Sequence, residues 1–335
     1  MPDIVLFKTE ELLPEAWRHF AEAGPVRVFN PGLLRDGDGW IFAYRVVGPD
    51  GLRRVGVCRL DAKLHVVNNS PEPFSDRVRF TAGRDYAGPA STWFADPRLY
   101  RLQGRIFIYW NSGWHEPRNH QFLQELDIVG LTPVGQPREL ILRGPRQPLE
   151  KNWTFFGDER LHAVYSPIPH RVLGFSLAGE GDIEFSELAI HDWNHASYAA
   201  AHGTLRGGAP PQLCNGHYWS FCHSVKGSEG YYRYTPAVYR FAATAPFAPT
   251  DAPTGELSLG NPTGDRRSFP KLNPAVGEVV YPCGAANHDG HWLVSYGIND
   301  ERCAIAILSH REVAGAVRPL VRGEDCALQG GESRR

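Results

Sequence analysis

The chain has 335 residues, with 35 Lys and Arg against 37 Asp and Glu, so its formal net charge is -2. This balance lacks the basic excess needed to track a phosphate backbone and argues against a nucleic-acid partner. No apolar stretch reaches the length of a membrane-spanning helix, and the N-terminus has no basic segment followed by an apolar run. A cytoplasmic protein without a membrane partner is therefore expected.

The composition favours one domain with many turns. Gly occurs 35 times and Pro 27 times, and no Gly/Ser-rich or Pro-rich linker separates two halves. The cysteines form no C-x-x-C pair and mostly stand within apolar strand patterns, which indicates reduced, buried thiols. The six cysteines are Cys58, Cys214, Cys222, Cys283, Cys303 and Cys326.

A short helix is predicted near the N-terminus, over Pro14 to Ala23. Pro14 suits the first helical position, Glu15 favours the first turn, and Gly24 can end the helix. Residues 1–27 are expected to form a helical extension outside the main domain. A second helical pattern, His191 to Ala201, is weaker.

The rest of the chain consists of short segments with the alternating pattern of β-strands. Five short polar or proline-containing sequences, called openings, precede these segments at intervals of roughly 55 to 75 residues. Each segment is rich in β-branched and aromatic residues and is bounded by Gly, Asp, Asn or Pro. This pattern predicts an all-β, five-bladed β-propeller over residues 28–315, followed by a C-terminal tail, 316–335. The openings are Asn30-Pro31, Asp96-Pro97-Arg98, Glu150 to Trp153, Arg206 to Pro210, and Tyr281-Pro282-Cys283.

The openings of propeller blades converge at one mouth of the central channel, so residues far apart in sequence are expected to become neighbours. Carboxylate, guanidinium, ammonium and imidazole groups at one small mouth can polarise a glycosidic bond. The residues expected there are Asn30, Arg45, Asp96, Arg98, Lys151, Asn152, Arg206, His223, Tyr296 and Asp300.

Other polar clusters carry weaker functional signals. The stretch Trp114 to His120 and the pair His191 and His195 contain metal-ligand types, but loop solvation and the absence of a suitably placed Glu favour no metal. Aromatic side chains are candidates for stacking on a sugar face. The best placed are Trp93, Trp110, Trp114 and Trp153.

Six ordered motifs resemble those of glycoside hydrolase family 130, which contains inverting β-mannoside phosphorylases and β-mannosidases on a five-bladed propeller. The resemblance extends over about residues 28 to 310. The motifs are Asn30-Pro31 with Tyr44-Arg45, Ala95 to Arg98, Lys151 to Trp153, Arg206 to Pro211, Phe221 to His223, and Val280 to Gly284 ending in Ser295 to Asp300.

The resemblance implies an enzyme without a cofactor that acts on a small oligosaccharide or glycoside, with inorganic phosphate as a candidate co-substrate. It implies Asp96 as proton donor and Lys151, Arg206 and His223 as the phosphate or anion site. Oligomeric state is left open. The residues implied in substrate binding are Asn30, Arg45, Arg98, Asn152, Tyr296 and Asp300.

Two departures from the family pattern leave the reaction open. Ala95 replaces the glutamate that precedes the acid, and Ser166-Pro167 stands where phosphorylases carry a second phosphate-binding arginine, with His170 or Arg171 as candidate substitutes. Hydrolysis would need a carboxylate base. A glycosyltransferase that uses a sugar nucleotide and an inactive glycan-binding propeller also stay open. The candidate bases are Glu116, Glu150, Asp158 and Asp300.

Overall fold

The computed structural model describes residues 2–81, 84, 90–112, 119–144, 150–228, 231–264 and 266–320. Cys326 and most of the stretch Trp114 to His120 lie outside the described residues. Within them, no helix is long and apolar enough to cross a membrane.

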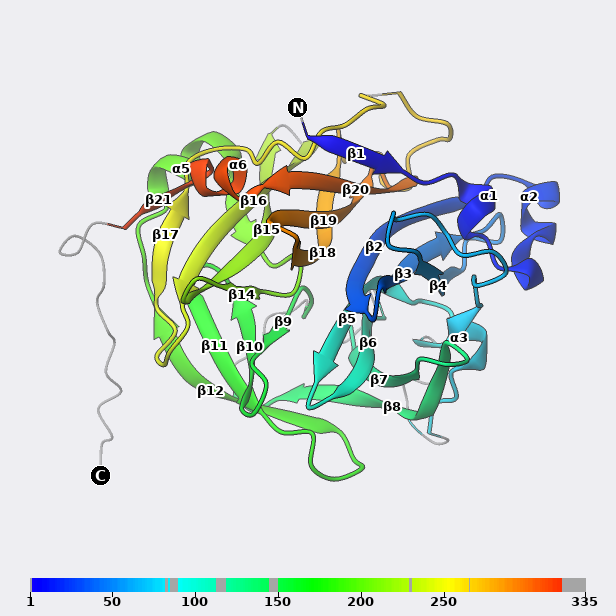
Figure 1. Ribbon diagram of the computed structural model, residues 1–335, viewed down its shortest axis with the longest axis horizontal. Coiled ribbons are helices and arrows are strands. Elements are labelled where there is room, and N and C mark those ends of the chain that lie inside the picture. Colours follow the sequence, from blue (N-terminus) through cyan, green and yellow to red (C-terminus); the bar gives the residue numbers. More distant parts are fainter. Residues whose placement is uncertain are drawn as a thin grey trace.

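Five antiparallel units surround a common centre, so the predicted five-bladed propeller is confirmed (Figure 1). The first blade contains β2 (Arg27–Asp36), β3 (Gly39–Val47) and β4 (Arg53–Leu60). The second contains β5 (Ala95–Leu102), β6 (Arg105–Asn111), β7 (Gln121–Asp127) and β8 (Thr132–Leu142), and the third contains β9 (Thr154–Phe156), β10 (Leu161–Ser166), β11 (His170–Phe175) and β12 (Ile183–His191). The fourth contains β13 (Thr204–Arg206), β14 (Gln212–Cys214), β15 (His217–Ser228), β16 (Tyr231–Ala242) and β17 (Pro249–Pro253), and the fifth contains β18 (Val280–His288), β19 (His291–Ile298) and β20 (Arg302–Ser309).

Both ends of the described chain add strands to blades. β1 (Asp3–Leu6) pairs antiparallel with β20, and β21 (Val317–Pro319) pairs antiparallel with β17. The segments expected as an N-terminal extension and a C-terminal tail therefore each contain a propeller strand. Because β1 pairs with the last blade, it ties the two ends of the repeat together (Figure 1).

The helical segments are short. In place of one helix over Pro14 to Ala23, a single 3-10 turn, η1 (Glu15–Trp17), precedes α2 (His19–Ala23), and α1 (Thr9–Leu12) comes before both. The buried Trp17 anchors this region, because its Nε1 donates to Oδ2 of Asp76 at 2.8 Å. The other helices are α3 (Phe74–Arg77), α5 (Ala196–His202), which falls largely in the second predicted segment, and α6 (His310–Gly315).

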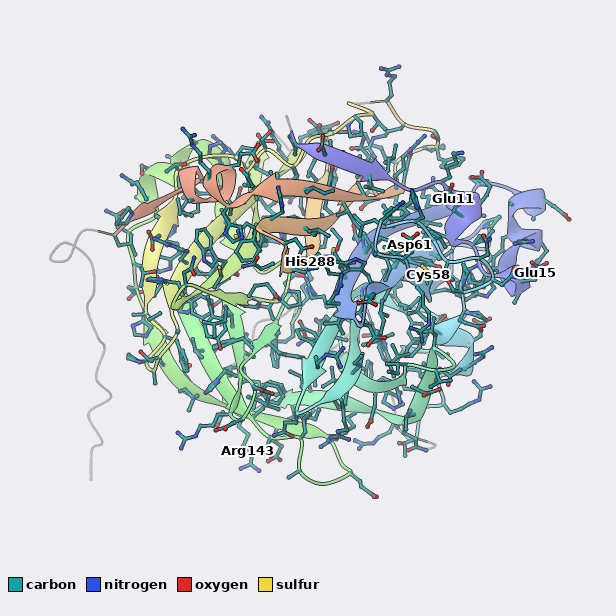
Figure 2. The ribbon with its side chains drawn as sticks, in the orientation of Figure 1. Glu11, Glu15, Cys58, Asp61, Arg143 and His288 are labelled. Carbon is teal, nitrogen blue, oxygen red and sulfur yellow. The ribbon has the colours of Figure 1, made fainter. Side chains whose placement is uncertain are left out.

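The hydrophobic core is divided among the interfaces between neighbouring blades. Strand residues alternate between two faces, and each face packs on the adjacent blade. Phe42 and Ile305, for example, share the cluster between the first and fifth blades. The five cysteines in the described residues are free and buried, as predicted. Figure 2 shows Cys58 inside the first blade, whereas Glu11 and Glu15 lie on the peripheral helices.

Candidate active site

The innermost strands of three blades are bulged where they reach the propeller centre. The pairing register shifts between Phe29 and Gly32 in β2, between Ala95 and Arg98 in β5, and between Pro282 and Gly284 in β18. A bulge re-aims side chains near an active site. The sequence openings that contain proline therefore become breaks in the strand at the central axis.

Polar residues with left-handed backbone conformations stand at two of these breaks and beside strands of two other blades. Asn30 and Asp96 both have φ of 53°, Asn152 has φ of 65° and Asp300 has φ of 57°. Asn and Asp adopt this region more readily than other side chains, and such residues cluster at functional sites. The Asn-Pro and Asp-Pro openings thus encode a backbone turn that presents a polar side chain.

Two glycines allow neighbouring segments of the chain to approach these polar residues. A Cβ added to Gly297 would lie 2.0 Å from Oδ1 of Asn30, and one added to Gly207 would lie 2.0 Å from the carbonyl oxygen of Asn152. Neither position has room for a side chain. Gly207 and Gly297 are therefore required by the packing of the centre.

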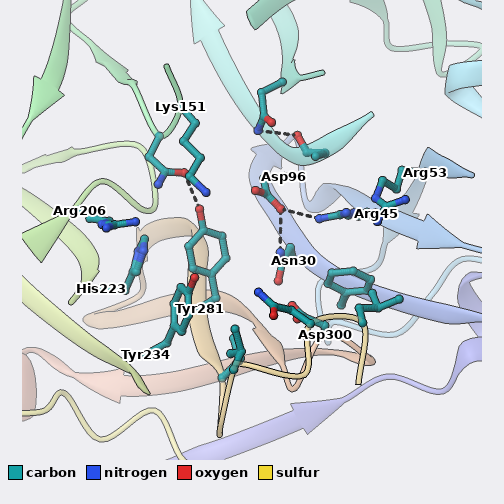
Figure 3. A pocket seen from close by; sticks show the side chains of 18 of the residues that line it. Asn30, Arg45, Arg53, Asp96, Lys151, Arg206, His223, Tyr234, Tyr281 and Asp300 are labelled. Carbon is teal, nitrogen blue, oxygen red and sulfur yellow. Dashed lines mark hydrogen bonds and ion pairs between the residues drawn. The ribbon is translucent and has the colours of Figure 1, made fainter. Parts of the chain in front are cut away.

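A cavity of about 330 Å³ opens at this centre, and most of the predicted site residues line it (Figure 3). Besides the charged and polar groups it includes aromatic and apolar walls. The lining residues are Phe29, Asn30, Arg45, Arg53, Trp93, Ala95, Asp96, Asn111, Lys151, Asn152, Arg206, His223, Tyr234, Leu272, Asn273, Pro274, Val276, Val279, Tyr281 and Asp300.

Asp96 is held by two partners from the first blade. Nδ2 of Asn30 donates to Oδ1 of Asp96 at 2.8 Å, and a guanidinium nitrogen of Arg45 lies 3.4 Å from the same oxygen. Burial favours the neutral acid, but the charge of Arg45, the hydrogen bond from Asn30 and the charge of Lys151 outweigh it and lower the pKa of Asp96. Without a ligand, Asp96 is a carboxylate at neutral pH.

Asp300 is the second carboxyl group of the cavity, and its pKa is shifted in the opposite direction to that of Asp96. Burial raises the pKa of Asp300, the charge of Arg45 opposes this effect, and the negative charge of Asp96 reinforces it. Among the described residues, no other Asp or Glu lines the cavity. The two environments push the pKa values of the carboxyl groups apart, which is a common feature of acid–base sites.

A cationic group lies on the other side of Asp96 from Arg45 (Figure 3). It contains Lys151 and Arg206, and the imidazole of His223 lies beside them. Burial lowers the pKa of Lys151 although Asp96 opposes the shift, and burial together with the charges of Arg206 and Lys151 lowers the pKa of His223 well below its ordinary value. His223 is therefore neutral at pH 7.

Several polar atoms in this region have no partner within the described part of the chain. Arg206 is exposed and makes no side-chain hydrogen bond or ion pair there. Nδ1 of His223 and Oδ1 of Asn30 are buried without a hydrogen bond. Arg206 and His223 both line the cavity, where a ligand could contact their polar atoms.

Arg98 and Tyr296, which were expected to bind substrate, are not among the residues that line the cavity. Arg98 has no exposed surface, and its guanidinium donates to the carbonyl of Gly208, to Asn152 and to Tyr281. These partners come from the third, fourth and fifth blades, so Arg98 is buried among segments that surround the axis. The buried Tyr296 donates to the carbonyls of Leu259 and Gly260.

The third blade supplies no substitute for the absent phosphate-binding arginine. Oγ of Ser166 donates to the carbonyl of Pro169. His170 is buried against Phe241, and Arg171 pairs with Glu187. None of these side chains lines the cavity.

Two candidate bases are placed elsewhere, and a third lies outside the described residues. The buried carboxylate of Glu150 accepts from Nε1 of Trp153 at 3.2 Å and from the hydroxyl of Tyr165 at 2.9 Å, a structural arrangement. Asp158 does not line the cavity, and Glu116 is not described. Asp300 is the predicted base that reaches the site.

Sequence reasoning missed Arg53 and Tyr234 as site residues. Trp93 was a candidate platform and does line the cavity, whereas Trp110 and Trp153 are fully buried elsewhere and Trp114 is outside the described residues. Arg53 stands in a polar hairpin where charged residues are ordinary. No local pattern distinguishes it.

No family model matches the chain, and no curated protein sequence matches it. Solved structures share its architecture. A β-1,2-mannobiose phosphorylase from Listeria innocua has 13% identity and a TM-score of 0.59 over 94% of this chain and 99% of that chain. A glycosyl hydrolase from Bacteroides ovatus has 13% identity and a TM-score of 0.57 over 90% and 87% of the two chains.

A third match comes from the GH130 family of mannoside phosphorylases, which contains glycoside hydrolases that target β-1,2 mannosidic linkages in Candida mannan. It has 13% identity and a TM-score of 0.59 over 88% of this chain and 87% of that chain. The chain has the GH130-like propeller fold. The fold that the six motifs implied is thereby confirmed, and the activity is argued from the site.

Proposed function

We propose that this protein is an inverting glycosylase for β-mannosides or similar short glycosides, with phosphate as the attacking co-substrate and Asp96 as the proton donor. The observation that carries the proposal is the position of Asp96 between two cationic groups in one polar cavity (Figure 3). Structures of the same fold include a β-1,2-mannobiose phosphorylase, which supports the substrate class.

The charge of the cavity favours phosphate over water as the nucleophile. Four cationic side chains line it, Arg45, Arg53, Lys151 and Arg206, against the two carboxylates Asp96 and Asp300. Guanidinium and ammonium groups bind phosphate strongly when partly desolvated. Lys151 and Arg206 lie together on one side of Asp96, where an anion would be held by both charges (Figure 3).

Phosphate binding also favours the protonated form that the acid needs. The positive charge of Lys151 helps to keep the pKa of Asp96 low. An anion bound beside Lys151 cancels much of this effect, so the pKa of Asp96 rises as the co-substrate binds. The bound complex is thus better able than the free protein to hold a proton on Asp96.

The proposed step balances without a further reagent. A phosphate oxygen forms a bond to the anomeric carbon while the glycosidic C–O bond breaks. The proton on Asp96 passes to the departing oxygen, directly or through a sugar hydroxyl. A β-glycoside then gives an α-sugar 1-phosphate and a free hydroxyl on the departing sugar.

Hydrolysis is the second candidate because Asp300 also lines the cavity. An inverting hydrolase needs a second carboxylate to activate water on the face opposite the acid. Asp300 is the one described carboxylate besides Asp96 at the cavity wall.

A screen of manno-oligosaccharides with and without phosphate separates the two reactions, because phosphorolysis gives sugar phosphate and hydrolysis gives free sugar in both conditions. Sugar transfer from a sugar nucleotide to an acceptor would instead identify a glycosyltransferase. Glycan binding without bond cleavage in either condition would identify an inactive glycan-binding propeller.

Asp96→Asn tests the proton donor. General acid catalysis contributes about 10²- to 10⁴-fold, so the variant is expected to lose at least about 100-fold in kcat on the cognate glycoside. Asp289→Asn, at a side chain that is 85% exposed, is the matched control and is expected to retain activity. Full turnover by a normally folded Asp96→Asn protein contradicts the assignment.

A further inference from the structure

Arg53 is a cation at the cavity wall with no carboxylate partner among the described residues. One of its terminal nitrogens donates to the carbonyl of Gly51 at 2.8 Å, and its Nε is buried without a hydrogen bond. Its guanidinium carbon lies 3.6 Å from the centre of the Trp93 ring. In the proposed cleavage reaction this group contributes only to the positive charge of the cavity.

The backbone fixes Arg53 and Trp93 relative to one another. They form a parallel bridge, in which the amide of Arg53 donates to the carbonyl of Thr92 and the amide of Phe94 donates to the carbonyl of Arg53. A guanidinium stacked on an indole keeps its plane defined while its edge stays available for hydrogen bonds. The pair is therefore a preorganised group.

The surroundings of Arg53 favour an anion. Burial and the neighbouring charge of Arg45 lower the pKa of Arg53 to about 10, while Asp96 partly opposes the shift. Asp96 already pairs with Arg45, at 3.4 Å. A partly buried cation beside a like charge is unfavourable, and an anionic group on the ligand would relieve this repulsion.

Arg53 lies on the side of the cavity where the departing sugar is expected to bind. In an inverting displacement, the nucleophile and the leaving group occupy opposite faces of the anomeric carbon. Phosphate held by Lys151 and Arg206 therefore directs the departing sugar toward Arg45 and Arg53, which lie on the other side of Asp96 (Figure 3).

We propose that Arg53, held by Trp93, forms a subsite for the carboxylate of a uronic acid in the departing position of the glycoside. This inference rests on the proposed function for the orientation of the substrate. A carboxylate matches the planar donors of a guanidinium, which bind both of its oxygens. The natural substrate is then an acidic disaccharide or a fragment of an acidic polysaccharide.

The test is a calorimetric titration of the full chain, without phosphate, with two β-mannosyl disaccharides that differ only in the reducing sugar, glucuronic acid or glucose. The protein is expected to bind the acidic disaccharide about 10- to 100-fold more tightly, the range for a charged hydrogen-bonded contact. High salt is expected to reduce this preference. Equal affinity for the two ligands overturns the subsite without any variant.

Two variants test whether Arg53 is the source of the preference for the acidic disaccharide. Arg53→Gln is expected to abolish the preference while binding the neutral disaccharide within about twofold, and Arg53→Lys, which keeps the charge but loses the planar donors, is expected to be intermediate. Arg54→Gln, next in the chain and paired with Asp50 away from the cavity, is the matched control. An acidic preference that persists in folded Arg53→Gln contradicts the subsite.

Turnover of the neutral disaccharide with phosphate, measured separately, tests the proposed function. Acidic preference without turnover supports the subsite and rejects the reaction. Turnover without acidic preference supports the reaction and rejects the subsite.

Discussion

Asp96 shows how individual neighbours set the chemistry of one carboxyl group. Asn30 and Arg45 both contact its Oδ1, and both favour the ionised form over the neutral acid that burial alone would favour. Because the folded-state pKa is lowered, the stability that this group contributes is present above the ordinary aspartate pKa. It is lost as pH falls through the folded-state value.

Asn30→Ala is expected to raise the pKa of Asp96, because the variant loses a hydrogen bond that favours the charged form. The measurement is a carboxyl ¹³C NMR titration of the ligand-free protein. Asn68→Ala, at an exposed loop position outside the cavity, is expected to leave the titration unchanged. An unchanged or lower pKa of Asp96 in Asn30→Ala would show that the hydrogen bond does not control this group.

Asn30, Asp96 and Asn152 were found from sequence because short-range chemistry places them. Each has a left-handed backbone conformation and stands before proline or an aromatic residue, and at Asn30 and Asp96 the strand is also bulged. Arg98 does not line the cavity, because it is buried and hydrogen-bonded to Gly208, Asn152 and Tyr281, tertiary contacts that no local pattern reveals. Arg53 and Trp93 were not recognised as a pair because they are 40 positions apart and meet only through tertiary pairing.

At the scale of strands, close approach around the axis depends on glycines that have no room for a side chain. Gly297→Ala is expected to displace Asn30, because the new Cβ would lie 2.0 Å from its Oδ1. Loss of this contact with Asp96 is expected to reduce kcat at least about tenfold, within the range found when a catalytic group is misplaced.

The matched control is Gly315→Ala in α6, where a Cβ meets nothing within 4 Å. Steady-state kinetics of both variants, together with their circular dichroism spectra, check the prediction. A folded Gly297→Ala protein with normal kcat would contradict the prediction that displacing Asn30 reduces kcat.

A second feature at this scale is the cross-strand pair His170 and His191 of β11 and β12. His170 is fully buried, its Nε2 has no hydrogen bond, and burial together with the charge of His191 lowers its pKa to about 3. The unfolded chain takes up a proton near pH 6.5, but the folded protein does not until much lower pH. Stability is therefore full above pH 6.5 and falls as pH decreases toward 3.

His170→Phe is expected to remove this contribution, which amounts to roughly 3 kcal/mol at pH 4. Urea denaturation at pH 7 and pH 4 measures it as the difference between the two free energies of unfolding. His19→Gln, at an exposed position, serves as the control. The same acid destabilisation in His170→Phe as in the unmodified protein would place its origin elsewhere.

Across the whole molecule, the repeat of five openings was sufficient to predict the blade count, because each hairpin unit carries its own strand and turn signals. The strand pairing that closes the ring of blades was not predicted. β1 pairs with β20 at a separation of about 300 residues, and its four residues have no distinctive pattern. The short β21 was missed for the same reason, since its partner β17 lies in an earlier blade.

The arrangement of the blades also explains why one cavity contains groups from every blade. Arg45 comes from the first blade, Asp96 from the second, His223 from the fourth and Asp300 follows β19 of the fifth, while Lys151 precedes β9 of the third. The groups proposed as acid, anion site and sugar-binding residues are therefore held by different sheets around one axis, and their arrangement in one cavity depends on the ring being closed.

The most direct test of the account is a time-resolved proton and phosphorus NMR experiment with β-mannobiose, inorganic phosphate and the full chain. Inverting phosphorolysis predicts that the mannosyl group is released as α-mannose 1-phosphate, with one equivalent of free mannose as the departing sugar, and that no cleavage occurs when phosphate is omitted. Release of free mannose at the same rate with and without phosphate would contradict the central claim.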